Sequence, residues 1–245
     1  MKKLPELTAL FWLTKIVATT LGETAGDLLS MTLNVGYATS SLILIGGFLV
    51  IVSMQLWLNR YIPFVYWFVV LATSTSGTTM SDYMDRTLGF GYAKGSLLLI
   101  CLLLVILFLW KLSEKSLSVT TITNKRTETF YWTAILFSNT LGTALGDYLA
   151  DDSGLGFAGG AILIGSVLIV LILAHYYTKI SSVFLFWVAF ILTRPFGATF
   201  GDLLTKSTEK GGLDYGTKGA SLILFTMLFG LLIYETKHLK KYDNE

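Results

Sequence analysis

Long apolar stretches alternate with short polar ones along the whole chain. Each apolar window covers about 20 residues, the length of an α-helix that crosses a hydrocarbon core about 30 Å thick. The windows are continuously apolar and do not alternate with period two, which disfavours an eight-stranded membrane barrel. The pattern therefore predicts an all-α integral membrane protein with eight transmembrane helices, near residues 7–28, 37–58, 62–83, 92–111, 129–149, 157–177, 182–204 and 216–235.

The composition supports lipid as the main solvent. Hydrophobic residues make up 53% of the chain and charged residues only 14%, against about 25% charged in an average soluble domain. This deficit excludes soluble enzymes and disordered linkers. The net charge of +2 has no dense basic tract behind it, so no nucleic-acid partner is expected. The single cysteine, Cys101, can form neither an internal disulfide nor a thiolate metal site.

The distribution of lysine and arginine predicts the orientation in the membrane. The side that holds both termini carries 11 of these residues and the opposite side 5, so the positive-inside bias places both termini in the cytoplasm. The residues on the terminal side are Lys2, Lys3, Arg60, Lys111, Lys115, Lys125, Arg126, Lys179, Lys237, Lys240 and Lys241.

One motif recurs in every second predicted helix. A Trp is followed by Gly ten residues later, and by a small residue and Asp at fourteen and fifteen. The four Asp residues are 55, 65 and 55 positions apart, so two helices form one repeat. We expect one membrane domain, residues 1–245, with repeats at about 7–58, 62–111, 129–177 and 182–235 and a cytoplasmic linker at about 112–128. The four copies begin at Trp12, Trp67, Trp132 and Trp187.

Because each repeat crosses the membrane an even number of times, all four copies insert in the same orientation. The expected pseudo-symmetry axis therefore runs along the membrane normal, unlike that of inverted-repeat transporters. This arrangement resembles a bacterial family of polytopic membrane proteins built from a tandem repeat of unknown function, and the resemblance covers essentially the whole chain. It implies the same four-repeat fold in a bacterial inner (plasma) membrane, and no particular activity.

Small residues one turn apart accompany each Asp. Such pairs let helix backbones approach closely in lipid, so we expect these glycines to serve helix packing, and the same pairs could also assemble a homo-oligomer. The glycines concerned are Gly22, Gly26, Gly77, Gly142, Gly146, Gly197 and Gly201.

A polar stripe runs beside these glycines on the same four helices. Lipid rejects carboxylates and rows of hydroxyls, so the stripe is expected to line a central hydrated cavity. Fifteen residues between Trp and Asp span about 22 Å, which places the Asp residues near the outer boundary if the Trp residues are interfacial belt anchors. This position of the Asp residues is compatible both with a central pore and with a vestibule at the outer membrane surface. The predicted solute- or ion-binding residues are Asp27, Asp82, Asp147, Asp202, Glu23, Thr24, Thr78, Thr79, Thr143 and Thr199.

Two lysines occupy matching positions in the second and fourth copies only. We expect Lys94 to pair with Asp82 and Lys218 with Asp202. The pseudo-symmetry would then be two-fold, and the other acidic residues would be left without a lysine partner. The freer acids, Asp27, Asp147 and Glu23, form the predicted metal site.

Two further cations lie inside predicted spans. Arg194, directly before Pro195, needs a carboxylate or a freed carbonyl near mid-membrane, and is expected to act as a structural clamp, with a gate or anion contact as the alternative. Lys15 is expected to snorkel to the cytoplasmic interface.

The leading interpretation is a transporter or channel-like carrier of a small cationic solute, a divalent metal, a proton or both, through an Asp- and Thr-lined central cavity. Hard oxygen ligands suit Mn²⁺, Mg²⁺ and Ca²⁺, and clustered carboxylates titrate as a set. The alternative is a membrane sensor that captures a small ligand without transport, in a cavity closed on the cytoplasmic side by bulky apolar residues; a structural scaffold is third. No catalytic motif is present, so neither enzyme activity nor a cofactor is expected.

Overall fold

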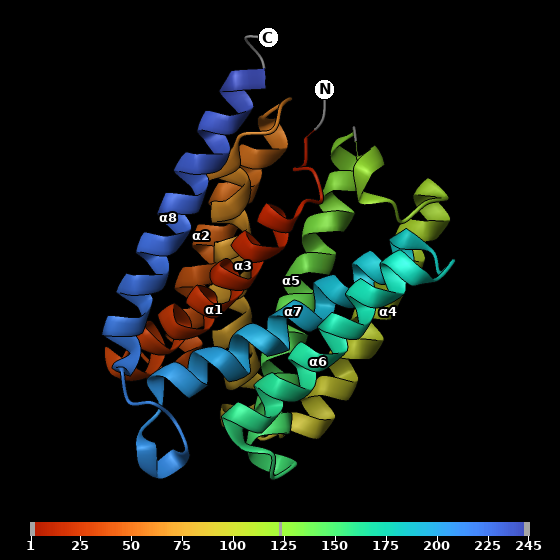
Figure 1. The fold of residues 1–245 in the computed structure, drawn as a ribbon. Helices are drawn as coiled ribbons and strands as arrows, with labels where there is room; N and C mark the ends of the chain where they lie inside the picture. Colours follow the sequence, from red (N-terminus) through yellow and green to blue (C-terminus); the bar gives the residue numbers. More distant parts are fainter. Residues whose placement is uncertain (1–2, 123, 243–245) are drawn as a thin grey trace.

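The computed structural model describes residues 3–122 and 124–242, and this part of the chain is predominantly α-helical (Figure 1). Lys2, counted above among the basic residues of the terminal side, lies outside it. The predicted number of helices is confirmed. The described α-helices are α1 (Ala9–Asp27), α2 (Tyr37–Trp57), α3 (Pro63–Asp82), α4 (Tyr92–Glu114), α5 (Lys125–Asp147), α6 (Gly156–Tyr177), α7 (Ser182–Thr205) and α8 (Gly216–Tyr242).

Three of the four motif helices end in the same way. The Asp is the last residue of α1, α3 and α5, and a single π-helical turn follows it, namely η1 (Leu28–Thr32), η2 (Tyr83–Thr87) and η4 (Tyr148–Asp152). Because the helical backbone continues past the Asp, its carboxylate does not sit at a bare helix C-terminus. Short π segments of this kind are frequent at functional sites.

A glycine in the left-handed region precedes or begins each even-numbered helix. Gly36, Gly91, Gly156 and Gly216 have φ between 67° and 82°, a conformation that costs glycine little and other residues much. The chain can therefore reverse sharply after each Asp and send the next helix back along the bundle.

The four odd-numbered helices form a closed inner ring. Helix α1 packs against α3 and α7, and α5 also packs against α3 and α7. The even-numbered helices lie outside: α2 covers α3, α4 covers α5, α6 covers α7, and α8 returns to cover α1. Each outer helix thus covers the inner helix of the following repeat, and no repeat is complete alone.

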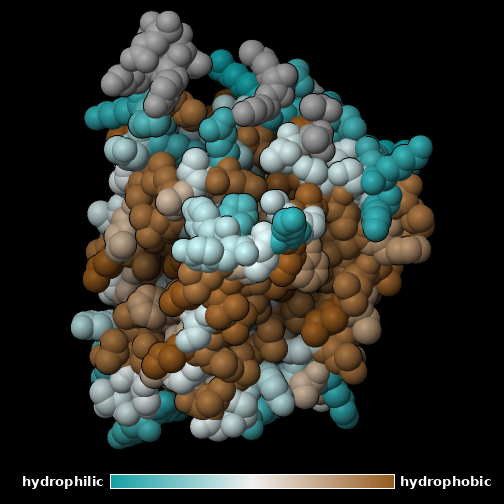
Figure 2. Space-filling model, turned by 45° about the vertical axis from the view of Figure 1, so that its right-hand side comes forward, coloured by the Kyte–Doolittle hydropathy of each residue, from teal (hydrophilic) through white to brown (hydrophobic). Residues whose placement is uncertain are grey.

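The bundle has two chemically distinct ends. Helix α1 begins and α8 ends at the same end (Figure 1), called here the terminus end. The four motif Asp residues lie toward the other end, called here the Asp end. Side chains between the ends form a largely hydrophobic band, with hydrophilic residues above and below it (Figure 2).

Five of the eight described helices, α2, α4, α6, α7 and α8, are long and apolar enough to cross a membrane. The prediction that all eight helices cross the membrane is not confirmed for α1, α3 and α5, which do not meet this standard. The reason is that these helices carry the polar stripe, which the ring buries. The outer helices supply the apolar surface, and only about a quarter of α2 or α4 is buried, 22% and 28% of their most apolar windows.

Glycines set the distance between neighbouring inner helices. In each copy, the Gly five residues before the Asp lies against a residue of the next copy, the one eight positions before that copy's Asp. A Cβ atom on this Gly would overlap the residue it lies against. These seams pair Gly22 with Ser74, Gly77 with Asn139, Gly142 with Arg194, and Gly197 with Thr19.

The seams generate the first prediction. A Cβ at Gly77 would lie 2.8 Å from the backbone nitrogen of Thr140, which cannot move aside without shifting α5. We expect Gly77→Ala to destabilise the protein by about 1–3 kcal/mol, the usual cost of overpacking, seen as a lower Tm in detergent. Gly46→Ala is the matched control, because nothing lies within 4 Å of a Cβ there. Equal melting temperatures for the two variants would contradict the packing described here.

Candidate cation site at the Asp tier

A continuous row of buried side chains runs along each inner helix. Counting back from the Asp in steps of four residues, every position is at most 6% exposed in all four copies. The row in α1 contains Asp27, Glu23, Thr19, Lys15 and Phe11. The matching rows are Asp82, Thr78, Ser74, Val70 and Tyr66 in α3; Asp147, Thr143, Asn139, Ile135 and Tyr131 in α5; and Asp202, Ala198, Arg194, Phe190 and Phe186 in α7.

The four motif Asp residues, called here the Asp tier, are all buried. Two cations at the Asp end join them in pairs. Arg86 Nε lies 2.8 Å from Asp82 and its Nη2 lies 3.4 Å from Asp147. Lys206 Nζ lies 2.6 Å from Asp27 and 3.1 Å from Asp202. Each cation therefore links two adjacent inner helices.

The predicted pairing with Lys94 and Lys218 is wrong. Both lysines are exposed, and neither forms an ion pair with any residue in the described ranges. The cations that do pair stand four residues after the Asp, one helical turn on, where the side chain folds back onto the carboxylate. They occur only in the second and fourth copies, since Met31 and Asp151 occupy that place in the other two.

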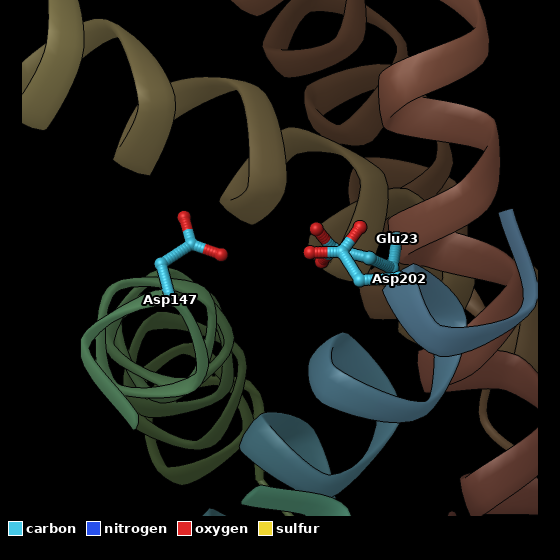
Figure 3. Close-up of side chains that lie close together, drawn as sticks. All are labelled: Glu23, Asp147 and Asp202. Atoms are coloured by element: carbon cyan, nitrogen blue, oxygen red, sulfur yellow. The ribbon is translucent and has the colours of Figure 1, made fainter. Parts of the chain in front are cut away.

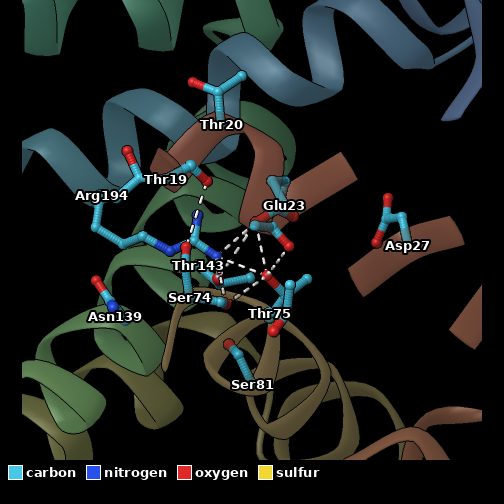
Figure 4. A network of polar contacts seen from close by, with 12 residues as sticks. Thr19, Thr20, Glu23, Asp27, Ser74, Thr75, Ser81, Asn139, Thr143 and Arg194 are labelled. Carbon is cyan, nitrogen blue, oxygen red and sulfur yellow. Dashed lines mark hydrogen bonds and ion pairs between the residues drawn. The ribbon is translucent and has the colours of Figure 1, made fainter. Parts of the chain in front are cut away.

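Arg194 connects the four inner helices one layer deeper (Figure 4). The residue comes from α7 and is fully buried. Its Nη2 lies 2.9 Å from Glu23 Oε2 of α1, 2.6 Å from Thr78 Oγ1 of α3 and 2.7 Å from Thr143 Oγ1 of α5. The same two hydroxyls donate to Glu23 Oε2. The ring centre at this depth therefore holds a side-chain network, where the sequence had led us to expect a hydrated cavity.

Three carboxylates converge beside this network. Glu23, Asp147 and Asp202 come from α1, α5 and α7 and face a common space (Figure 3), and one oxygen from each lies within 4.8 Å of the others. The expected metal set contained Asp27 in place of Asp202. In the structure Asp27 is not in this group, and its carboxylate accepts a hydrogen bond from Lys206 at 2.6 Å.

The predicted threonines divide into two sets. Thr78 and Thr143, four residues before an Asp, belong to the central network. The three at the position three residues before an Asp bond elsewhere. Thr24 lies 2.9 Å from Ser221 of α8, Thr79 donates to the Ser76 carbonyl, and Thr199 donates to the Pro195 carbonyl.

An unbroken cycle of eight aromatic rings lies between the network and the terminus end. In each copy the motif Trp and the aromatic residue before it form a pair, and each pair contacts the pair of the next copy, with centroid separations of 5.3–6.5 Å. The members of this aromatic cycle are Phe11, Trp12, Tyr66, Trp67, Tyr131, Trp132, Phe186 and Trp187. The expectation that the tryptophans are interfacial belt anchors is wrong for Trp67, Trp132 and Trp187, which are at most 5% exposed.

Lys15 also lies elsewhere than predicted. It was expected to snorkel, yet it is fully buried, and its Nζ lies 3.6 Å from the centroid of the Phe190 ring with no hydrogen-bond partner among the described atoms. The repeat itself carries the signal for this burial, because Lys15 aligns with Val70, Ile135 and Phe190, positions that are apolar in the other three copies.

The buried rows and their two capping cations do not balance in charge. Five carboxylates, Glu23 and the Asp tier, face three paired cations, Arg194, Arg86 and Lys206. Buried charges are costly unless they are paired. With Lys15 uncharged the excess is two negative charges, which matches one divalent cation or two protons, and with Lys15 protonated the excess is one. Oxygen ligands favour Mg²⁺, Mn²⁺ or Ca²⁺ over soft metals.

The ion pair between Arg194 and Glu23 generates the second prediction. Arg194→Met leaves a buried carboxylate without its partner, so we expect a loss of about 3–5 kcal/mol and a lower Tm in detergent. The double variant Arg194→Met/Glu23→Gln removes both charges and should recover part of this loss. Arg126→Met is the control, because Arg126 is 74% exposed and 3.9 Å from Glu114. An Arg194→Met protein as stable as that control would refute a central ion pair.

Comparison with known families gives one match that covers most of the chain. The profile described as Repeat of Unknown Function (DUF347) matches four times in tandem, at residues 10–61, 65–116, 130–181 and 185–238. Comparison with curated proteins and with solved structures finds no match. Each matched segment contains one inner helix and the outer helix that follows it. The chain therefore belongs to the Repeat of Unknown Function (DUF347) family.

Proposed function

We propose that the protein is a membrane transporter of a small cation, with Glu23, Asp147 and Asp202 as its cation site. In this proposal all eight helices cross the bilayer. Helices α1, α3, α5 and α7 form the inner ring, which the other four shield from lipid. Both termini face the cytoplasm of a bacterial cell, and the Asp end faces outward. The solute is a divalent metal ion, and protons serve as the coupling ion.

The observation that carries this proposal is the convergence of three buried carboxylates with a surplus of negative charge. Their oxygens lie within 4.8 Å of one another. Oxygens on opposite sides of Mg²⁺, Mn²⁺ or Ca²⁺, each about 2.0–2.6 Å from the ion, are about 4–5 Å apart. One such ion could therefore contact all three carboxylates and offset both surplus charges.

The layers on either side of this site suggest how an ion could reach and leave it. At the Asp end, Arg86 and Lys206 form ion pairs with the tier, and their side chains are 33% and 19% exposed. Toward the terminus end, the path meets the Arg194 network and then the aromatic cycle. Glu23 belongs to both the cation site and the Arg194 network, so a bound cation and Arg194 would compete for its carboxylate.

A binding or sensor protein is the competing candidate, and the aromatic cycle favours it. Bulky rings close the inner helices toward the terminus end, as expected for a ligand that is held and not moved. A second buried polar cluster beyond the cycle favours transport. There Glu128 of α5 accepts from Lys3 Nζ at 2.8 Å and from Gln55 Nε2 at 3.0 Å.

The third prediction tests the site with Mn²⁺ as the probe. We expect the purified protein to bind Mn²⁺ and proteoliposomes to transport it. Asp147→Asn and Asp202→Asn should each weaken binding at least about 10- to 100-fold, since even outer-shell changes at metal sites have effects of this size. Asp152→Asn is the matched control, an exposed acid close in sequence to Asp147 but outside the cluster.

The two candidate functions predict different results in this experiment. Binding in detergent without flux in proteoliposomes would favour the sensor. If Asp147→Asn and Asp202→Asn leave Mn²⁺ binding and Mn²⁺ flux unchanged, the assignment of the site is contradicted.

A further inference from the structure

Lys15 is the buried charged group that the proposed cation site leaves unexplained. It lies 12 residues before Asp27 in the buried row of α1, on the terminus-end side of the Arg194 network. Its Nζ faces the Phe190 ring at 3.6 Å and has no hydrogen-bond partner in the described part of the chain. No carboxylate forms an ion pair with it among the described residues.

The surroundings of Lys15 disfavour a permanent positive charge. Of the helices packed on α1, α7 presents Phe190 and the guanidinium of Arg194, a like charge that acts on Lys15. Helix α3 carries Val70 at the matching row position. On α8, the carboxylate of Glu235 is held by Tyr61 and Trp67, and Lys218 is exposed. A single cation–π contact stabilises an ammonium by less than the burial of an unpaired one costs.

We propose that Lys15 is the proton-binding site of the carrier, a neutral amine in the closed conformation and an ammonium once the aromatic cycle opens to the terminus end. Its neighbour toward that end is Phe11, a member of the cycle. When the rings part, water reaches Nζ, whose lone pair takes one proton. The inference rests on the proposed function and identifies where its coupling ion binds.

Protonation of Lys15 would weaken the cation site through space. Eight helical residues separate Lys15 from Glu23, about 12 Å along α1. A unit charge and a divalent ion at that separation, with an effective dielectric constant near 20, interact strongly enough to change an affinity about 100-fold. Proton uptake from the terminus end therefore favours release of the cation, and cation binding favours release of the proton. This reciprocity is the thermodynamic basis of exchange.

The fourth prediction uses two substitutions that fix the charge in opposite states. Lys15→Met is always neutral and Lys15→Arg always charged, so at every pH we expect Lys15→Arg to bind Mn²⁺ about 100-fold more weakly than Lys15→Met. Wild-type affinity should follow Lys15→Met at high pH and move toward that of Lys15→Arg as the pH falls. Ile135→Met, at the same row position of α5, is the control and should follow the wild-type curve.

The outcomes separate this inference from the proposed function. Mn²⁺ binding with one common pH curve for all four proteins would overturn the role of Lys15 and leave the cation site standing. Absence of Mn²⁺ binding in the wild type would instead refute the cation site.

A second measurement does not depend on metal binding or on a folded Lys15→Arg protein. In wild-type protein with ¹⁵N-labelled lysine, at a pH at which exposed lysines are ammonium groups, we expect one neutral-amine Nζ resonance that is missing from Lys15→Met. A spectrum in which every lysine is an ammonium would overturn the proposal.

Discussion

The close approach of the four inner helices is the constraint on which the rest of the structure depends. At each seam a glycine lies against the neighbouring helix with no room for a side chain, as Gly77 does against Asn139 and Thr140. Helices this close bury every fourth residue of each row, whatever its chemistry. A lipid environment then forces those residues to satisfy one another, because no water is available to polar groups that face the bilayer core.

The polar rows meet this requirement unevenly. Arg194 satisfies Glu23 and two threonine hydroxyls at once, and one cation from each half of the chain, Arg86 or Lys206, joins two members of the Asp tier. These pairs still leave the carboxylates in excess. A structural cluster with no ligand would be more stable if the excess were removed, since buried ion pairs contribute little net stability and unpaired buried charges cost several kcal/mol. The excess is therefore the feature that most favours a cation-binding role.

The sequence predicted the architecture because the repeat carries it. The spacing of Trp, Gly and Asp identified the four inner helices, and the glycine pattern pointed to close packing. The alternation between copies also predicted that cations from the second and fourth repeats would pair with Asp82 and Asp202. The expectation that Asp27, Asp147 and Glu23 stay freer was wrong, because Lys206, Arg86 and Arg194 form ion pairs with them. The prediction named the wrong cations, Lys94 and Lys218. The cations that pair, Arg86 and Lys206, follow Asp82 and Asp202 by four positions, across a π-helical turn or the last turn of α7. The sequence did not specify that the chain would stay helical there.

Two other errors share one cause. Trp67 and Lys15 were both assigned to the membrane interface from residue type alone, and both are buried. Which face of α1 or α3 meets its neighbours follows from the glycine seams and the ring closure, which are tertiary contacts. Reading every fourth residue back from the Asp in all four copies would have placed Lys15 in a buried row, since the aligned positions Val70, Ile135 and Phe190 are apolar.

Anomalous diffraction from crystals of the protein grown with Mn²⁺ tests the central claim most directly. The account predicts a single anomalous peak within about 2.0–2.6 Å of carboxylate oxygens from Glu23, Asp147 and Asp202. A map with no peak inside the ring, and with those three carboxylates bonded only to protein groups, would contradict it.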